Sequence, residues 1–143
     1  MNPKLLMVPS TDGVQIAVHD YGGDGPPIIF CHATGFHGRY WDSICSLLLE
    51  DFRCISLDFR GHGDAETPKG TSMKWIGMAE DLLSVVDHFK FKEIFGVGHS
   101  MGGASLLLAE KNRGEVFKSL WLFEPIVIPS GPLVEKLSRG NDL

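Results

Sequence analysis

The feature that most constrains the fold is a short turn, Gly98-His99-Ser100-Met101-Gly102, which lies between two segments of opposite preference. Residues 93–97 before it are mostly apolar and favour a strand, whereas residues 103–110 after it are good helix formers. A strand that turns sharply into a helix around G-x-S-x-G presents the serine hydroxyl at the tip of the turn. Gly98 and Gly102 carry no side chain, so we expect the strand and the helix to approach closely there.

This turn predicts Ser100 as a nucleophile with an oxyanion hole beside it. The backbone N–H of Met101 lies at the helix N-terminus, where N–H groups have no partner within the helix. A second donor is expected from His32-Ala33-Thr34-Gly35, which ends an apolar strand; we expect the N–H of Thr34, with Ala33 as the alternative. Two plainer interpretations remain: Ser100 only caps the helix, and residues 32–35 are an ordinary turn.

A serine nucleophile also needs a general base and a carboxylate that orients the base. With this motif the order along the chain is serine, acid, histidine, yet no residue after Ser100 is a histidine. His37 and His62 follow predicted strands and could approach the site, while His99 is expected to point away from Ser100. Glu124 directly follows the last predicted strand, so it is a candidate acid, or else a carboxylate that lines a pocket or fixes a loop.

A second polar segment, Asp58-Phe59-Arg60-Gly61-His62-Gly63, also ends a predicted strand. It could hold a metal ion or a catalytic Asp–His pair. No second cluster of ligands lies nearby in the sequence, and the spacing typical of zinc sites is absent. We therefore favour a glycine-rich loop fixed by Asp58 and Arg60, and we expect no metal.

Strand and helix patterns alternate along the chain, which predicts an α/β fold with a mainly parallel, doubly wound sheet. The predicted strands are 14–19, 27–32, 53–58, 94–99 and 119–123, and residues 5–8 are expected to form a hairpin with 14–19 around Asp12-Gly13. The predicted helices are 40–49, 71–89 and 101–112. The first should bury Trp41, Ile44, Leu47 and Leu48; the second should bury Trp75, Ile76, Ala79, Leu82, Leu83 and Val86 and expose Glu80, Asp81 and Asp87.

Composition excludes several classes of function. The net charge is −5, from 13 basic and 18 acidic residues, and without a basic cluster a nucleic-acid partner is not expected. Cys31, Cys45 and Cys54 are odd in number and lack metal-ligand spacing, so they indicate buried, reduced thiols and a cytoplasmic location. No apolar run is long enough for a membrane span, and the N-terminal run is too short for a signal peptide.

Three segments in this order, 32–35, 58–63 and 98–103, resemble the α/β-hydrolase superfamily, in its esterase, lipase and haloperoxidase-like branch. The resemblance covers residues 14 to 125. It implies a nucleophile at Ser100, an oxyanion hole from Met101 and Thr34, and no cofactor. Glu124 matches the position after the sixth strand, where some branches keep their acid. Ala33 stands where glycine is usual, and Ala65 where serine is common.

The function implied by the resemblance is a carboxylesterase-like serine hydrolase acting on a small ester or related acyl substrate. A cofactor-free haloperoxidase or carbon–carbon bond hydrolase would use the same serine. Epoxide hydrolases and haloalkane dehalogenases are disfavoured, because their nucleophile is a carboxylate.

A typical member of the superfamily continues for roughly as many residues again, and the missing part would hold the histidine. The sequence therefore predicts the N-terminal part of a hydrolase, with core residues 1–124 and the start of a cap or a tail at 125–143. The alternative is a catalytically inactive half-domain that binds a partner or dimerises through the exposed strand 119–123. Nucleotide binding is disfavoured, since the glycines near Gly98 form neither G-x-G-x-x-G nor a P-loop.

Overall fold

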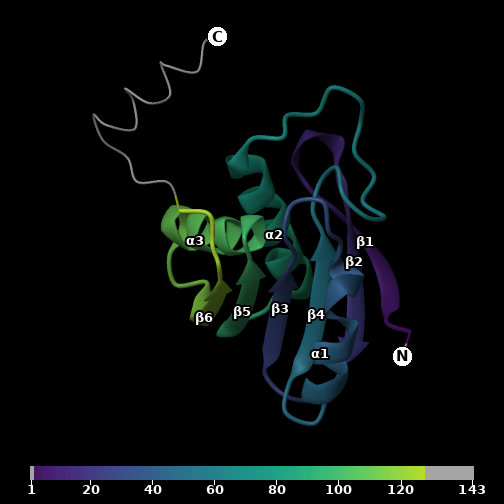
Figure 1. The fold of residues 1–143 in the computed structure, drawn as a ribbon, viewed down its shortest axis with the longest axis vertical. Coiled ribbons are helices and arrows are strands. Elements are labelled where there is room, and N and C mark those ends of the chain that lie inside the picture. Colours follow the sequence, from purple (N-terminus) through teal and green to yellow (C-terminus); the bar gives the residue numbers. More distant parts are fainter. Residues whose placement is uncertain (1, 128–143) are drawn as a thin grey trace.

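The computed structural model describes residues 2–127, which form one six-stranded sheet in the order β1-β2-β4-β3-β5-β6 (Figure 1). The strands are β1 (Lys4–Pro9), β2 (Gln15–Gly22), β3 (Pro27–Cys31), β4 (Arg53–Asp58), β5 (Ile94–His99) and β6 (Phe117–Phe123). The helices are α1 (Asp42–Leu48), α2 (Trp75–Phe89) and α3 (Met101–Arg113), with short 3-10 turns η1 (Thr11–Gly13) and η2 (Gly38–Trp41).

The sheet is mainly parallel, as predicted. β4, β3, β5 and β6 run parallel to one another, whereas β1 and β2 form an antiparallel hairpin that joins β4 in antiparallel orientation. Because the four parallel strands point the same way, the loops at their carboxyl ends gather at one edge of the sheet, where open α/β sheets place their sites.

Helices cover both faces of the sheet, so the fold is doubly wound. On one face Ile29, Cys31, Ile55 and Leu57 pack with buried residues of α2 and α3. On the other face Ile28, Phe30 and Cys54 pack with Trp41 and Cys45, from η2 and α1, and Figure 1 shows α1 in front of β4. Adjacent residues of β3 thus enter different cores, which explains its continuous apolar run.

Most element boundaries agree with the sequence prediction, and β4 and β5 match it residue for residue. The hairpin of β1 and β2 forms as predicted, with β2 extended to Gly22, and β6 begins two residues early, at Phe117. The main error is the start of α2, which lies at Trp75 rather than at residue 71.

Two predicted buried faces were wrong in part: Trp41, Ala79, Leu82 and Val86 are buried as predicted, but four other residues are exposed. In α1, Ile44 is 43% exposed and Leu47 is 81% exposed, whereas Cys45 is buried. The prediction assumed one continuous helix from residue 40, but the chain first makes the tighter 3-10 turn η2, which shifts the helical stripe. Trp75 and Ile76 are also exposed, because α2 begins at Trp75 and its first turn extends past the core.

Asp81 was predicted to face solvent, and this was wrong. Asp81 and Arg60 are both fully buried, and Asp81 accepts hydrogen bonds from Nε and Nη2 of Arg60 at 3.0 and 2.9 Å. Arg60 also pairs with Asp12, and Asp81 accepts the hydroxyl of Ser10 at 2.6 Å. A buried charge is tolerated here because every charged group has a partner.

Three further predictions concern the cysteines, membrane spans and the division at residue 124. All three cysteines are free and fully buried, as predicted. In the part of the chain that the structure describes, no helix combines the length and the apolar character that a membrane span requires. The predicted division at residue 124 stays a prediction, because most of the 125–143 segment lies outside the described residues.

The Arg60–Asp81 pair gives a test of the fold. Asp81→Ala removes the only fully buried carboxylate that pairs with Arg60 in the described residues and leaves it the half-exposed Asp12, so we expect the free energy of unfolding in urea to fall by about 3–5 kcal/mol. The matched control is Asp87→Ala on the same helix, whose ion pair with Arg113 is largely exposed and should cost less than about 1 kcal/mol. Equal losses in the two variants would contradict this account.

Candidate active site

Ser100 lies in the turn between β5 and α3 and has an unusual backbone conformation, with φ 50° and ψ −110°. Its N–H donates to the carbonyl of Phe123, at the end of β6, at 3.0 Å. Its own carbonyl accepts the N–H of Ala104 at 3.1 Å and that of Ile126 at 3.3 Å. The strained residue is therefore held from both sides, by the first turn of α3 and by the end of β6.

The two glycines of the turn allow close backbone packing, as predicted. A Cβ atom on Gly98 would lie 2.6 Å from the amide nitrogen of Gly103. A Cβ on Gly102 would overlap the carbonyl of Cys31 and lie 2.7 Å from the carbonyl oxygen of His32. The start of α3 is thus pressed against the end of β3, which places it beside the 32–35 loop.

The structure brings together the two residues predicted to form the oxyanion hole. Thr34 and Met101 line one cavity of about 220 Å³. Thr34 lies in a tight turn in which the N–H of Phe36 donates to the carbonyl of Ala33 at 3.1 Å. Met101 is the first residue of α3, where N–H groups lack helical partners and the helix dipole favours negative charge.

His32 fixes the position of the loop after β3, which contains Thr34. It is fully buried, its Nδ1–H donates to the carbonyl of Ala33 at 2.8 Å, and its Nε2 accepts the N–H of Phe59 at 3.2 Å. Burial lowers the pKa of His32 to about 4, against an ordinary value of 6.5. The neutral ring is the form that can accept at Nε2, so His32 joins the loops after β3 and β4 only while it is uncharged.

Asp58 joins the same loops, which confirms the prediction that it fixes a loop. Its carboxylate accepts the N–H of Gly38, the N–H of Asp64 at 2.8 Å and Nε2 of His19 at 3.1 Å. Burial raises the pKa of Asp58, but these hydrogen bonds outweigh it and leave the pKa below its ordinary value. The histidine paired with Asp58 is therefore His19 and not His62.

The structure shows one group of side chains that could hold a metal ion, within residues 2–127. His19, Asp58 and Asp64 each place a ligand atom within 4.8 Å of the others. Both Asp58 oxygens already accept hydrogen bonds from the loops that it fixes. A metal ion would have to displace those bonds, so the donor set fits a structural anchor better than a metal site.

The other histidines differ in how near they come to the site. His62 lines the cavity with Thr34 and Met101, and its Nδ1–H donates to the carbonyl of Arg60 at 2.9 Å. The ring of His99 contacts the rings of Phe123 and Phe36, and His37 is exposed before η2. Within the described residues, no side-chain hydrogen bond joins Ser100 to a histidine.

Glu124 is exposed and follows β6 directly, with φ 45°. The residue before it, Phe123, binds the Ser100 amide, so Glu124 is one residue away from the turn. Across residues 2–127 its carboxylate makes no hydrogen bond or ion pair. Its role as the acid therefore stays a prediction.

Sequence reasoning missed the side chains that form the wall of the cavity, Met73, Trp75 and Met78. Trp75 was instead assigned to the helix core. No sequence signal marks these residues, because the cavity forms where four separate segments meet: 34, 62, 73–78 and 101.

Comparison with known proteins identifies the family. The pattern of the family described as the alpha/beta hydrolase fold matches residues 26–140. A non-heme haloperoxidase of Rhodococcus erythropolis is 34% identical over 120 residues, covering 81% of this chain and 43% of the relative. A 3-oxoadipate enol-lactonase of Acinetobacter baylyi is 27% identical, over 71% of this chain and 38% of the relative. This chain belongs to the α/β-hydrolase fold family.

Solved structures agree with this assignment. An esterase from Exiguobacterium antarcticum superposes with a TM-score of 0.79 at 28% identity, covering 87% of this chain and 46% of the esterase. An epoxide hydrolase from Vigna radiata reaches a TM-score of 0.84 at 22% identity, which shows the shared fold alone. The chain spans less than half the length of each of these proteins.

The buried, neutral His32 predicts a pH dependence of stability. As the pH falls from 6.5 towards 4, the unfolded chain takes up a proton at this ring while the folded chain does not. The contribution of His32 to the free energy of unfolding is therefore complete above pH 6.5. Acidification removes it, which lowers the free energy of unfolding by about 3 kcal/mol in all. Asp58, whose pKa is lowered, loses its contribution only at lower pH.

Urea unfolding between pH 7.5 and 4.5 measures this slope. His32→Gln should flatten it, whatever its effect on the absolute free energy of unfolding. His88→Gln, which changes an exposed histidine of α2, should leave the slope as it is. An unchanged slope in His32→Gln would show that His32 is not the group responsible.

Proposed function

We propose that this chain carries the nucleophile and the oxyanion hole of a serine hydrolase of the α/β-hydrolase fold, acting on a small ester or related acyl substrate. Ser100 Oγ attacks the carbonyl carbon of the substrate. The oxyanion of the tetrahedral intermediate then accepts hydrogen bonds from the backbone N–H groups of Met101 and Thr34. The observation that carries the proposal is the strained turn at Ser100, packed so that both donor residues line one cavity.

The relatives favour this reaction class without naming a substrate. Their names include a haloperoxidase, an enol-lactonase and an esterase. Lactone and ester cleavage both pass through an acyl-enzyme when the nucleophile is a serine. The side chain at the turn in this chain is Ser100 and not a carboxylate, which separates it from the epoxide hydrolase and dehalogenase chemistry of other family members.

The proposed mechanism also needs a base and an acid. No residue after Ser100 in this sequence is a histidine. We therefore propose that the base is a histidine in a segment equivalent to the part of the relatives that this chain does not cover. Glu124, one residue beyond the backbone bond to Ser100, is the proposed acid. His62 is the alternative base, because it lines the cavity beside Met101.

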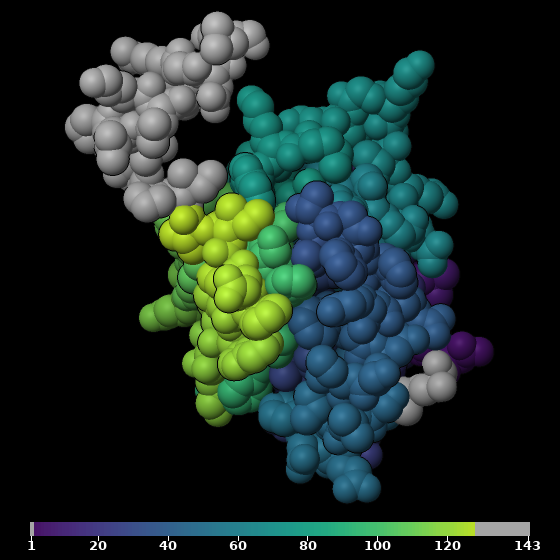
Figure 2. Space-filling view, viewed as in Figure 1, coloured from purple at the N-terminus to yellow at the C-terminus, as the bar shows by residue number. Residues whose placement is uncertain are grey.

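A second candidate function is self-association through β6. This strand lies at the edge of the sheet, and Trp121 and Phe123 are 60% and 50% exposed on the face opposite α3. Figure 2 shows the β6 segment, coloured yellow-green, open to the viewer beside the blue elements. Exposed strand edges with large apolar side chains favour pairing with a second chain.

A fluorophosphonate probe tests the first function. The polypeptide purified from its native source should acquire one adduct, and peptide mass spectrometry should locate it on Ser100, because an activated serine attacks the phosphorus. Ser100→Ala should abolish the adduct, and Ser119→Ala, which changes an exposed serine of β6, should retain it. A folded sample with no adduct, or with one on another residue, would overturn the proposal.

Sedimentation equilibrium tests the second function. The 143-residue chain should dimerise at micromolar concentration, and Trp121→Lys should make it monomeric, because the charge would be buried unpaired in the contact. Leu47→Lys changes a side chain of α1 that is 81% exposed and should leave the dimer intact. A monomeric parent chain, or equal dissociation in both variants, would refute dimerisation through β6.

A further inference from the structure

The cavity beside the oxyanion hole has an unusual composition. Six residues line it: Thr34, His62, Met73, Trp75, Met78 and Met101. Three of the five methionines in the chain are therefore at this one place. We call it the methionine cavity.

The methionines form an adaptable apolar wall. Met78 and Met101 are 4% and 3% exposed, so they form the buried part of the wall. Met73 is 48% exposed, and its Cε lies against the backbone of Gly61, where a Cβ would come within 2.5 Å. Methionine has three rotatable bonds and a polarizable sulfur, so such a wall adjusts to ligands of different shape.

The polar groups of the cavity are few and carry no fixed charge. The polar side-chain groups are the hydroxyl of Thr34, the indole N–H of Trp75 and the ring of His62, whose Nδ1–H donates to the carbonyl of Arg60. Among residues 2–127, no Asp, Glu, Lys or Arg lines the cavity. An uncharged ligand therefore fits it, since a charged one would be desolvated without a partner.

We propose that the methionine cavity holds the acyl group of the substrate, and that the substrates are esters of short, uncharged aliphatic acids of varied shape. This proposal rests on the proposed acylation of Ser100, because Met101 and Thr34 belong both to the cavity and to the oxyanion hole. The volume of about 220 Å³ lies below the roughly 300–1,000 Å³ of pockets for drug-sized ligands. It therefore suits a short acyl chain.

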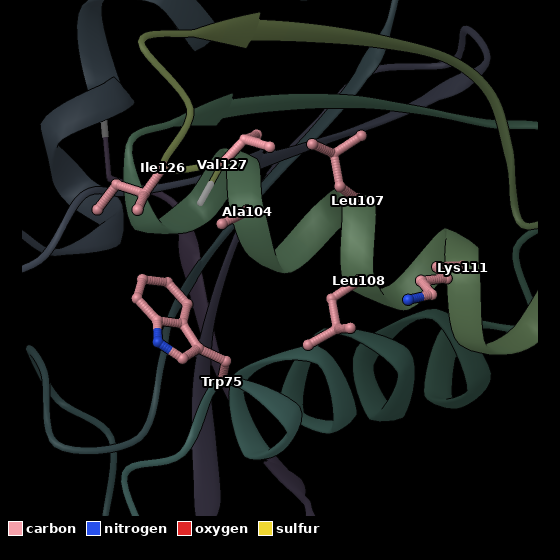
Figure 3. Close-up of a pocket in the computed structure, with 7 residues that line it drawn as sticks. All are labelled: Trp75, Ala104, Leu107, Leu108, Lys111, Ile126 and Val127. Atoms are coloured by element: carbon pink, nitrogen blue, oxygen red, sulfur yellow. The ribbon is translucent and has the colours of Figure 1, made fainter. Parts of the chain in front are cut away.

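Trp75 sets the limit on the length of the acyl chain that the methionine cavity can hold. A second cavity, of about 340 Å³, lies between α2, α3 and the residues after β6; it is apolar apart from Lys111, and Trp75 lines both cavities. Figure 3 shows Trp75 projecting from the start of α2 toward Ala104 and Ile126, with Leu108 nearby. The indole is thus a common wall, and a smaller side chain at position 75 would join the two cavities into one longer apolar channel.

Methyl NMR of the 143-residue chain labelled with ¹³C at the methionine methyl groups tests this without any chemistry at Ser100. The probes are butanamide and octanamide, which mimic an acyl group and resist hydrolysis. Butanamide should shift the Met73, Met78 and Met101 resonances saturably and leave that of Met7, on β1, unchanged.

The length limit is tested by Trp75→Ala in the same titrations. Octanamide affinity should rise at least about tenfold, equivalent to 1.4 kcal/mol, while butanamide affinity should change less than about threefold. Trp75→Leu is the second variant, and Trp121→Ala, at an exposed site on β6, is the control that should change neither.

Uniform shifts that include Met7, or no saturable shift with butanamide, would overturn the cavity assignment. Unchanged octanamide affinity in both Trp75 variants would overturn the length limit. A chain that fails fluorophosphonate labelling but shows these shifts would keep the cavity and lose the hydrolase, so the two failures are distinguishable.

Discussion

The site depends on the backbone hydrogen bonds that Ser100 makes with the end of β6, the first turn of α3 and the segment after β6. A non-glycine residue at φ 50° and ψ −110° stores strain of about 1–3 kcal/mol and persists only where its surroundings determine it. Here β6 holds its N–H, α3 and Ile126 hold its carbonyl, and two glycine contacts bring the segments together. The orientation of the Met101 N–H and the approach of the Thr34 loop both follow from these contacts.

A second layer of buried polar groups holds the loops around that turn. His32 and Asp58 each bridge the loop after β3 and the loop after β4, and the Arg60–Asp81 pair fixes the latter to α2. Each group has several partners, which offsets the cost of removing it from water. The edge of the sheet that carries Ser100 is therefore built on rigid support, which the proposed oxyanion hole would require.

The sequence predicted the parts of this structure that depend on local signals. β4 and β5 are short, largely apolar segments that end at turn residues, and the turn around Ser100 is marked by its two glycines, so their positions were correct. Asp81 was misplaced because an acidic residue in an amphipathic helix ordinarily faces solvent. Its burial depends on Arg60, which lies 21 positions away in the chain.

The wrong start of α2 and the missed cavity have a related cause. The helical spacing of apolar side chains begins at Trp75, and the prediction extended the helix over residues 71–74 because that spacing does not show where the helix starts. The cavity requires four segments to meet beside Met101, and only the three-dimensional fold shows that they do. Helical periodicity identifies a buried stripe and does not identify the space that the end of a helix encloses.

The most direct test of the account is a crystal structure of the protein after reaction with a small dialkyl fluorophosphate. The account predicts phosphorus bonded to Ser100 Oγ, with one phosphoryl oxygen about 2.7–3.1 Å from the backbone nitrogens of both Met101 and Thr34. A phosphoryl oxygen that points to solvent, or that reaches neither nitrogen, would show that the turn at Ser100 does not build an oxyanion hole.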